Sequence, residues 1–529
     1  MQKKTNKQAF VKVDYRLLYK KRILDYLKSL KDKDLTLWEM DEAMGKLFNL
    51  GDETVIPICL AKLRENDEEM APIVCYALEY ANNISVLEPL LEILIMTDVS
   101  DRIKARIIAV LGRYGVDAAD LPLEFILKDF DKVASDSMLE MFEDVQKDPF
   151  LIPHILDDLN EFSPEMRAAY IRDMGDLRDE RSIYLLEIIA FADDYLLAQE
   201  AVKALGKIKS GKALYVLFKL ANKSKDDKIR KLAFREAQRL RLSGVIMSYF
   251  EPWQNLKRPI KAFVSAIDGT GNRSIWMVWQ DPFKYKKLSF VNLLVNTELG
   301  VVDCWGVSDL TAREFNSSIN DFSKTTFIEK CDFDYVVALL GDALLVNQTK
   351  GSRIPYQFYF WKYLVELNDI IKYERYRPKF ETYDLEAIKN DDACLKKTFG
   401  LIDYGYFDDW FVRDPRVCAY AKESKAKHIR QMRKLSYQKS ENLFRNFTEE
   451  LIEPNINIIK RMLELSADFL ERSNCRDIAK LTLCAFLNMD MKPLCCHPFI
   501  QGLIIESLVM ALSNVRSESK IRSNLNRLK

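Results

Sequence analysis

The most concentrated set of polar residues in the chain is Asp268-Gly-Thr-Gly-Asn-Arg273, which lies between two apolar runs. Glycines permit unusual backbone angles and close approach, and a threonine hydroxyl, free amides and an arginine are groups that hold phosphate. Asp268, Thr270 and Arg273 are therefore candidate anion- or metal-binding residues. A plain turn closed by an aspartate side chain explains the same residues. Both interpretations stay open at this point.

The position of this segment resembles the first hairpin of actin-like and ribonuclease H-like folds, in which an aspartate ends the first strand and holds a metal or nucleotide. Asp303 and Asp332 are the candidate partner carboxylates that this resemblance implies. The segment lacks the third glycine and the helix start of a dinucleotide-binding loop. It defines our alternative function, an enzyme that acts on a phosphate-containing or nucleic-acid substrate through residues 268–273.

The cysteines and histidines form no recognised site. The C-terminal cluster does not have the Cys-x-x-Cys spacing of a zinc site, so no metal and no cofactor is expected; it comprises Cys475, Cys484, Cys495, Cys496 and His497. The chain has only 3 histidines, the usual general base, and no Ser-His-Asp arrangement.

An acidic stretch surrounds Trp410. Asp408, Asp409 and Asp414 could supply a paired acid and base, and the preferred interpretation is an acidic surface loop anchored by the tryptophan. Neither interpretation requires a cofactor.

The net charge of zero conceals two blocks of opposite sign. Residues 117–194 contain 21 Asp or Glu against 7 Lys or Arg, and residues 203–241 contain 13 basic against 3 acidic residues. Exposed charges interact over about 8 to 10 Å, so the blocks form separate patches. The candidate partner-binding residues lie in the basic block: Lys203, Lys207, Lys228 and Arg230. The two blocks could also stabilise each other inside the protein.

A second basic run covers residues 422–434, and the C-terminal tail from Arg516 to Lys529 is also basic. On a helix, Lys422, Lys425 and Arg433 would form one stripe beside a second stripe of basic residues. Phosphate contact is one interpretation and a solvated helix the other. Aromatic residues are not interleaved with the basic ones, so nothing indicates that the run reads bases.

The elements that must position these residues begin with a repeat. Helical segments that contain Ala and end in Gly recur in the first half, and their glycines are Gly112, Gly175 and Gly206, with Ala237 in a degenerate copy. The intervals are 63, 31 and 31 residues, so the first spans two periods. Small residues on the second helix of each pair let it pack closely on the next repeat, and the glycine is expected to end that helix.

These residues resemble HEAT repeats of the short kind found in phycobilisome lyases. Gln199-Glu-Ala-Val-Lys-Ala-Leu-Gly-Lys-Ile208 and Arg230-Lys-Leu-Ala-Phe-Arg-Glu-Ala237 look like the second helix of that repeat. The resemblance covers roughly 190 residues and implies an α-solenoid that binds through a curved helical surface. The Ala and Gly positions are lost at about residues 117–160, where the array is expected to be interrupted.

The pattern changes after Pro259. Four strand-like runs begin at Ala262, Ser274, Leu288 and Val301, and short turns join them, one of them opening at Asp281-Pro282. An antiparallel meander of four strands is expected, with helices on one face of the sheet. These helices begin at the capping box Thr311–Glu314 and include residues 335–346 and 356–367.

The chain is therefore predicted to be multidomain and mainly α. Capping helices over residues 1–50 precede a HEAT-like α-solenoid (51–245), an α+β domain (255–375) and a C-terminal helical region (380–529). In the first part, Val13, Leu17, Leu18, Ile23 and Leu27 have the spacing of an amphipathic helix. In the last, residues 443–470, 478–487 and 499–512 are predicted helical, and the third segment is apolar on most faces.

Composition limits the class of protein. The chain has 529 residues, 48% hydrophobic and 30% charged, with no apolar run long enough to span a bilayer. A cytoplasmic protein with reduced core thiols is expected. We favour a non-enzymatic scaffold that binds a protein partner through the charged HEAT-like surface; nucleic acid is a partner that no base-reading motif supports, and no membrane contact is expected.

Overall fold

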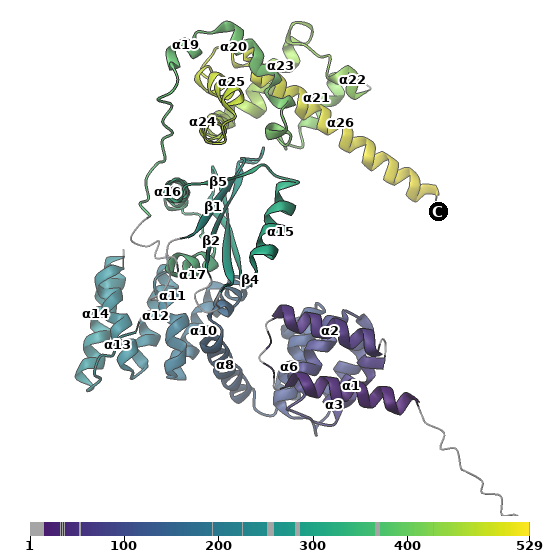
Figure 1. The fold of residues 1–529 in the computed structure, drawn as a ribbon, viewed down its shortest axis with the longest axis vertical. Coiled ribbons are helices and arrows are strands. Elements are labelled where there is room, and N and C mark those ends of the chain that lie inside the picture. Colours follow the sequence, from purple (N-terminus) through teal and green to yellow (C-terminus); the bar gives the residue numbers. More distant parts are fainter. Residues whose placement is uncertain are drawn as a thin grey trace, which may run out of the picture. The chain divides into compact units, whose positions relative to one another are not determined.

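The computed structural model describes residues 15–527, except residues 32, 34, 36, 52–53, 193, 225, 251–258, 281–285, 365–370 and 427. The chain divides into two compact units, residues 1–143 and 144–529. As predicted, it is mainly helical, with an antiparallel sheet in the middle and helices at the C-terminus (Figure 1). The predicted turn at Asp281-Pro282 lies outside the described residues.

The helices of the first unit surround one apolar core. They are α1 (Tyr15–Lys31), α2 (Leu37–Gly51), α3 (Val55–Arg64), α4 (Ala71–Ala81), α5 (Leu87–Leu94), α6 (Asp101–Arg113) and α7 (Leu123–Ile126). Ile23 and Leu27 of the predicted amphipathic helix are buried in this core. The side chains of Val13, Leu17 and Leu18 lie outside the described part. Helix α8 (Phe130–Lys147) crosses the division between the units, within the stretch where the repeat pattern is lost.

Three further helix pairs follow in the second unit. They are α9 (Ile152–Glu161) with α10 (Pro164–Asp176), α11 (Ile183–Ala190) with α12 (Tyr195–Lys207), and α13 (Gly211–Lys223) with α14 (Asp227–Leu242). The start of α10 follows the local sequence: Ser163 accepts a hydrogen bond from the Met166 amide at 3.3 Å, and Pro164 occupies the first helical position. The first helices of these pairs are α9, α11 and α13, and the second helices are α10, α12 and α14.

The recurring glycines do not end the second helices, so that prediction is wrong. Gly112, Gly175 and Gly206 lie inside α6, α10 and α12, and none has a positive φ. A Cβ on Gly175 would lie 2.7 Å from the Cα of Ala204, and one on Gly206 would lie 2.7 Å from the carboxylate of Glu236. The latter two glycines are therefore explained by close helix packing rather than by chain reversal.

The sheet consists of β1 (Lys261–Ser265), β2 (Asn272–Gln280), β3 (Leu288–Asn296), β4 (Gly300–Leu310) and β5 (Ile328–Cys331). Its order is β4-β3-β2-β1-β5, and all pairings are antiparallel. The first four strands form the predicted meander. The fifth strand was not predicted, because it has four residues and no run of apolar ones, and it joins the edge next to β1.

Helices cover both faces of the sheet, so the prediction of one covered face is wrong. Helix α15 (Ala312–Ser323) packs Phe315 against Trp276 and Phe290 on one face. Helices α16 (Phe333–Lys350) and α17 (Tyr356–Leu364) lie on the other face, where Trp361 contacts Trp279 (Figure 1). The cause is visible in β2 and β3, which are apolar on both faces rather than alternating.

The C-terminal helices are α19 (Leu385–Lys389), α20 (Asp392–Lys397), α21 (Val417–Glu423), α22 (Ile429–Met432), α23 (Glu441–Phe447), α24 (Ile456–Arg472), α25 (Arg476–Leu487) and α26 (Pro498–Arg527). The predicted segment 443–470 is divided by a π-helical turn, Thr448–Ile452. Phe499, Ile504 and Leu508 of α26 are fully buried, as its apolar sequence predicts. Within the described part of the chain, every helix falls short of the length and apolarity that crossing a bilayer requires.

Candidate functional site

The four predicted partner-binding residues lie on α12 and α14, and each has a contact within the protein. Lys203 pairs with Glu200 at 2.7 Å, and Lys207 pairs with Asp176 at 2.5 Å. Arg230 pairs with Asp227 at 2.6 Å, and the Lys228 ammonium lies 5.5 Å from the centre of the Tyr195 ring. The contacts of Lys203 and Arg230 are thus within their own helices, and the contact of Lys228 joins α14 to α12. Lys207 joins α12 to α10.

The ion pair between Lys207 and Asp176 joins two successive repeats, and two further ion pairs do the same. Lys212 reaches Glu180 at 2.5 Å and Lys219 reaches Glu187 at 3.0 Å, so in each pair a base follows an acid by 31 or 32 residues. The Lys212 ammonium holds the pKa of the Glu180 carboxyl below its usual range. Part of the acidic block and part of the basic block therefore stabilise the array internally, one of the two predicted uses of this charge.

Exposed residues recur on the second helices. Leu196 and Lys203 are seven residues apart on α12, and Arg230 and Phe234 are four apart on α14, so each pair shares a helix face. Arg172, Lys203 and Phe234 are also spaced by 31 residues, one repeat each. Leu196 is 60% exposed and Phe234 is 50% exposed. We call these five residues the second-helix surface.

Helix α17 of the same chain packs on the first helices α9 and α11 and is also held by residues at the starts of the second helices α10 and α12. The Tyr356 hydroxyl donates to Asp194 at 2.7 Å and accepts from Arg167 at 3.3 Å, and the Gln357 amide donates to Asp157. Tyr356 and Tyr359 also line a small cavity together with apolar side chains of α9 and α11. The array thus holds a helix that also packs on the sheet, and this arrangement was not predicted. Its signal was Tyr356-Gln-Phe-Tyr-Phe-Trp361, which is too uniformly aromatic for a helix with a solvent face.

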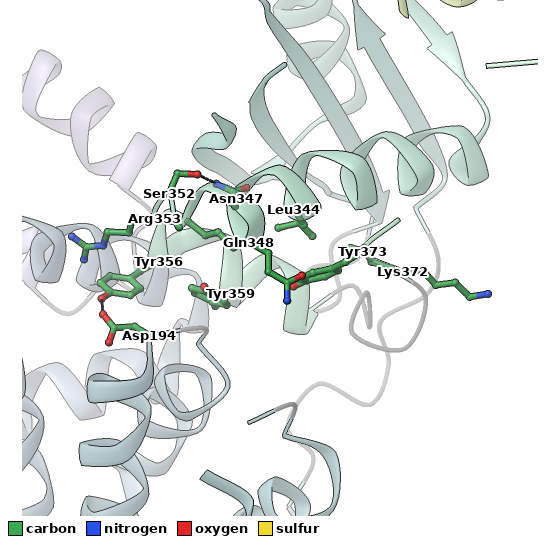
Figure 2. Close-up of a pocket in the computed structure, with 13 residues that line it drawn as sticks. Asp194, Leu344, Asn347, Gln348, Ser352, Arg353, Tyr356, Tyr359, Lys372 and Tyr373 are labelled. Atoms are coloured by element: carbon green, nitrogen blue, oxygen red, sulfur yellow. Dashed lines mark hydrogen bonds between the residues drawn. The ribbon is translucent and has the colours of Figure 1, made fainter. Parts of the chain in front are cut away.

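A cavity of about 830 Å³ lies beside this junction, a size typical of small-molecule sites. Its wall includes Tyr356, Tyr359, Asn347, Arg353 and Lys372 (Figure 2). The ends of Arg353 and Lys372 point in opposite directions, and the Arg353 guanidinium lies 4.5 Å from the centre of the Tyr356 ring. Burial and the bond to Asp194 raise the pKa of Tyr356.

The polar groups of this cavity are largely engaged by the protein. The Asn347 amide donates to the carbonyls of Leu299 and Val301 and to Ser352, and its oxygen accepts from the Val301 amide at 2.7 Å. The cavity offers space and aromatic surface, and the charged residues of its wall are Asp194, Arg353 and Lys372.

The loop from Asp268 to Arg273 brings together only part of the predicted site. One oxygen of Asp268 accepts from the Thr270 amide at 2.8 Å, the Thr270 hydroxyl at 2.6 Å and the Asn272 amide at 2.9 Å. This is the predicted turn closed by an aspartate side chain. Arg273 turns away into the interior and is 4% exposed.

The loop glycines allow another backbone to come close, and that backbone belongs to the acidic stretch of the same chain. A Cβ on Gly269 would lie 2.0 Å from the Asp409 carbonyl, and the Trp410 indole donates to the Ile267 carbonyl at 2.9 Å. Trp410 is 2% exposed and anchors the acidic stretch, as interpreted from the sequence. Asp303 accepts from the amide of Cys304, and Asp332 precedes α16. Across the described residues, no three His, Cys, Asp or Glu side chains gather as a metal site would require.

Substituting Asp268 tests the role of this loop. Asp268→Ala is expected to lower the free energy of unfolding by about 1–2 kcal/mol, because three internal hydrogen bonds lose their acceptor. Asp408→Ala, at an exposed position of the acidic stretch, is the control and should change it by at most about 0.5 kcal/mol. Urea unfolding measures both. A nucleotide or divalent ion that raises the melting temperature of the wild type but not of Asp268→Ala would favour the ligand site instead.

The basic run 422–434 does not form the predicted striped helix. Helix α21 ends at Glu423, and Lys425 has a φ of 56°, a left-handed backbone that a helix cannot contain. The Ser424 hydroxyl donates to the Ala421 carbonyl at 2.6 Å and so competes with continuation of the helix. Lys427 lies outside the described residues, as do the side chains of the basic tail.

His497 is part of the protein core. It is fully buried, and its Nε2 donates to the Ala485 carbonyl at 3.2 Å. Burial lowers the pKa of His497 to about 4 from 6.5. As the pH falls below 6.5, the unfolded chain takes up the proton first, so stability is lost between about pH 6.5 and pH 4.

This histidine gives a prediction on pH dependence. Between pH 7 and pH 5 the wild type is expected to lose about 2 kcal/mol of unfolding free energy more than His497→Gln, which keeps a donor but does not titrate. Urea unfolding of both proteins at the two pH values measures the difference. Equal losses would show that His497 is not held neutral in the folded protein.

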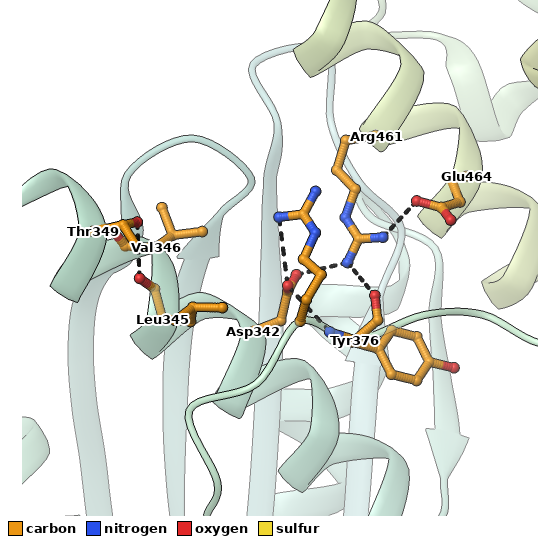
Figure 3. Close-up of polar contacts among 8 residues, drawn as sticks. Asp342, Leu345, Val346, Thr349, Tyr376, Arg461 and Glu464 are labelled. Atoms are coloured by element: carbon orange, nitrogen blue, oxygen red, sulfur yellow. Dashed lines mark hydrogen bonds and ion pairs between the residues drawn. The ribbon is translucent and has the colours of Figure 1, made fainter.

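Sequence reasoning missed a buried ion-pair cluster between α16 and α24. Asp342 and Arg461 are 7% and 6% exposed, and their side chains are joined at 2.8 Å. Arg461 also donates to the Tyr376 carbonyl at 2.7 Å and pairs with Glu464 at 2.5 Å (Figure 3). The two residues lie on helices far apart in the sequence, so no local pattern marked the pair.

Comparison with known proteins identifies one part of the chain. The family model of HEAT repeats matches residues 152–237, which contain α9 to α13 and most of α14. No curated protein matches the chain. HEAT repeats commonly mediate protein–protein interaction. The three helix pairs, their packing at Gly175 and Gly206 and the family match agree that residues 152–237 carry HEAT repeats.

Proposed function

We propose that this protein is a non-enzymatic scaffold that binds a protein partner through the second-helix surface. The observation that carries the proposal is the exposure of Leu196 and Phe234 on helices whose packing is already completed by small buried residues such as Ala201 and Ala233. Large apolar side chains contribute nothing to the fold when they face solvent, and they are typical of interfaces when they lie together.

Charge indicates the kind of partner. Helix α14 has six basic and two acidic residues, and the acidic Glu236 is buried. The apolar side chains of the second-helix surface are thus bordered by positive charge. The complementary partner has an acidic surface with an apolar centre, and its binding weakens as salt concentration rises.

The contact with α17 supports the use of this array for binding. Helix α17, which is rich in tyrosine and tryptophan, is held by Asp157 of the first helix α9 and by Arg167 and Asp194 at the starts of the second helices α10 and α12. The residues of the second-helix surface take no part in these contacts, and they include exposed apolar groups. The contacts with α17 serve internal assembly, and we assign the second-helix surface to the external partner.

The test begins with a tagged full-length chain, from whose source cells the copurifying protein is identified. Two variants then change the second-helix surface in different ways: Leu196→Ser with Phe234→Ser, and Lys203→Glu with Arg230→Glu. The second variant also carries Lys228→Glu, at a further predicted partner-binding residue on α14. Lys207 stays unchanged because it holds Asp176. Each variant is expected to weaken binding of the purified partner at least about tenfold by calorimetry.

A matched control reverses three other exposed basic residues that also have acidic neighbours: Lys324, Lys350 and Arg445. It should leave the affinity within about twofold. Unchanged affinity in both second-helix variants, with folding verified by circular dichroism, would contradict the proposal.

A further inference from the structure

Arg273 has no counter-ion among the described residues. It is the second residue of β2, its side chain lies on the face that α16 covers, and it is 4% exposed. Its Nε, Nη1 and Nη2 atoms are buried and make no hydrogen bond within the described part of the chain. The guanidinium lies 5.5 Å from the centre of the Phe469 ring. A buried cation without a partner is costly, because it gives up its hydration and gains little in return.

Hydroxyl groups surround Arg273. The Tyr335 hydroxyl is buried without a hydrogen bond among the described residues, and the Tyr406 hydroxyl lies close to Ser466 and Arg273. Burial raises the pKa of Tyr335 and of Tyr406, and in both cases the Arg273 charge opposes that rise, so both rings lie near the guanidinium. These hydroxyl groups are neutral, so none of them supplies the negative charge that would balance the guanidinium.

A small cavity adjoins Arg273. It measures about 20 Å³, room for one water molecule or one small ion, and its polar wall comprises Arg273, Asn296, Thr297 and Asp342. The Asn296 amide is committed to the Thr270 carbonyl and the Asn272 side chain, and the Thr297 hydroxyl is committed to the Gly271 carbonyl. Of the polar side chains in this wall, Arg273 is the one with open hydrogen-bonding capacity.

The carboxylates near the cavity are engaged by arginines other than Arg273. Asp342 is held by Arg461 at 2.8 Å and by Arg375 at 3.5 Å. Arg461 also pairs with Glu464 at 2.5 Å. The buried Asp468 is likewise engaged, by Arg472 at 3.2 Å. Among the described residues, Arg273 is therefore left without a carboxylate of its own.

We propose that the cavity beside Arg273 binds one small monovalent inorganic anion, such as chloride, as a structural ion between the sheet and α24. The anion supplies the missing negative charge and an acceptor for the guanidinium. A water molecule would fit the same space but would leave the charge uncompensated. Phosphate and sulfate are too large for about 20 Å³, so this is not the substrate site predicted for the loop.

Thermal unfolding of the full chain tests the proposal. Melting temperatures are compared in sodium chloride, sodium bromide and sodium gluconate at equal ionic strength, because gluconate is too large for the cavity. Both halides are expected to raise the melting temperature by about 1–3 °C over gluconate, with a saturating concentration dependence. Equal melting temperatures in the three salts would overturn the proposal.

Two variants test whether the rise in melting temperature in halide salts arises at the cavity beside Arg273. Arg273→Met is expected to lose the difference between halide and gluconate. Arg375→Met removes a half-exposed charge from the same region and should keep that difference. Persistence of the full halide effect in Arg273→Met would overturn the assignment.

Crystals of the wild-type chain soaked in sodium bromide decide the question without a variant. An anomalous bromine peak within about 3.5 Å of the Arg273 guanidinium is expected. Its absence, with only a water molecule in the cavity, would overturn the proposal even if Arg273→Met does not fold.

Discussion

Arg461→Met is expected to lower the free energy of unfolding by about 3–5 kcal/mol, the largest loss we predict for a single substitution. The change leaves the Asp342 carboxylate buried without its nearest cation, because Arg375 is farther away at 3.5 Å. The Tyr376 carbonyl loses its 2.7 Å donor as well. Urea unfolding of the full chain, followed by circular dichroism, measures the loss.

Two comparisons identify the cause of the stability loss in Arg461→Met. Arg445→Met breaks an exposed pair with Glu441 at 2.6 Å and should cost at most about 0.5 kcal/mol. The double variant Asp342→Leu with Arg461→Met should be more stable than Arg461→Met alone, because it removes the buried uncompensated charge. If the double variant loses the sum of the two single effects, the pair is not coupled and the explanation is wrong.

Gly175→Ala is expected to lower the free energy of unfolding by about 2–3 kcal/mol, although alanine is the better helix former. The new Cβ would lie 2.7 Å from both the Cα and the Cβ of Ala204 on α12. These atoms belong to the facing backbone and to its shortest side chain, so the contact is relieved only if α10 and α12 move apart. Thermal or urea unfolding measures the effect.

Gly112→Ala is the matched control, since Gly112 has the same place in the sequence repeat. A Cβ there would meet no atom within 4 Å, so the substitution should be neutral or stabilise the protein by up to about 1 kcal/mol. Equal effects at the two positions would show that the cost at Gly175 comes from the helix itself rather than from packing.

The sequence by itself determined the elements whose signals are local. The spacing of Gly175, Gly206 and Ala237 identified the repeat, because one helix pair packing on the next requires small residues at a fixed interval. The alternation of apolar runs and short turns identified the four-strand meander. It also placed the turn at Asp268, since an aspartate side chain closes a turn over its own neighbours.

Only the tertiary structure decided which side chains of these elements contact one another. Lys207 was predicted to face a partner and is joined to Asp176, and Arg273 was grouped with Asp268 and turns instead toward Phe469. Asp342 and Arg461 are 119 residues apart. Turn and helix signals depend on neighbours a few positions away, whereas the partner of a buried charge depends on which distant helix packs there. The HEAT repeats were therefore readable from spacing, and the buried charges became evident only when the helices were packed.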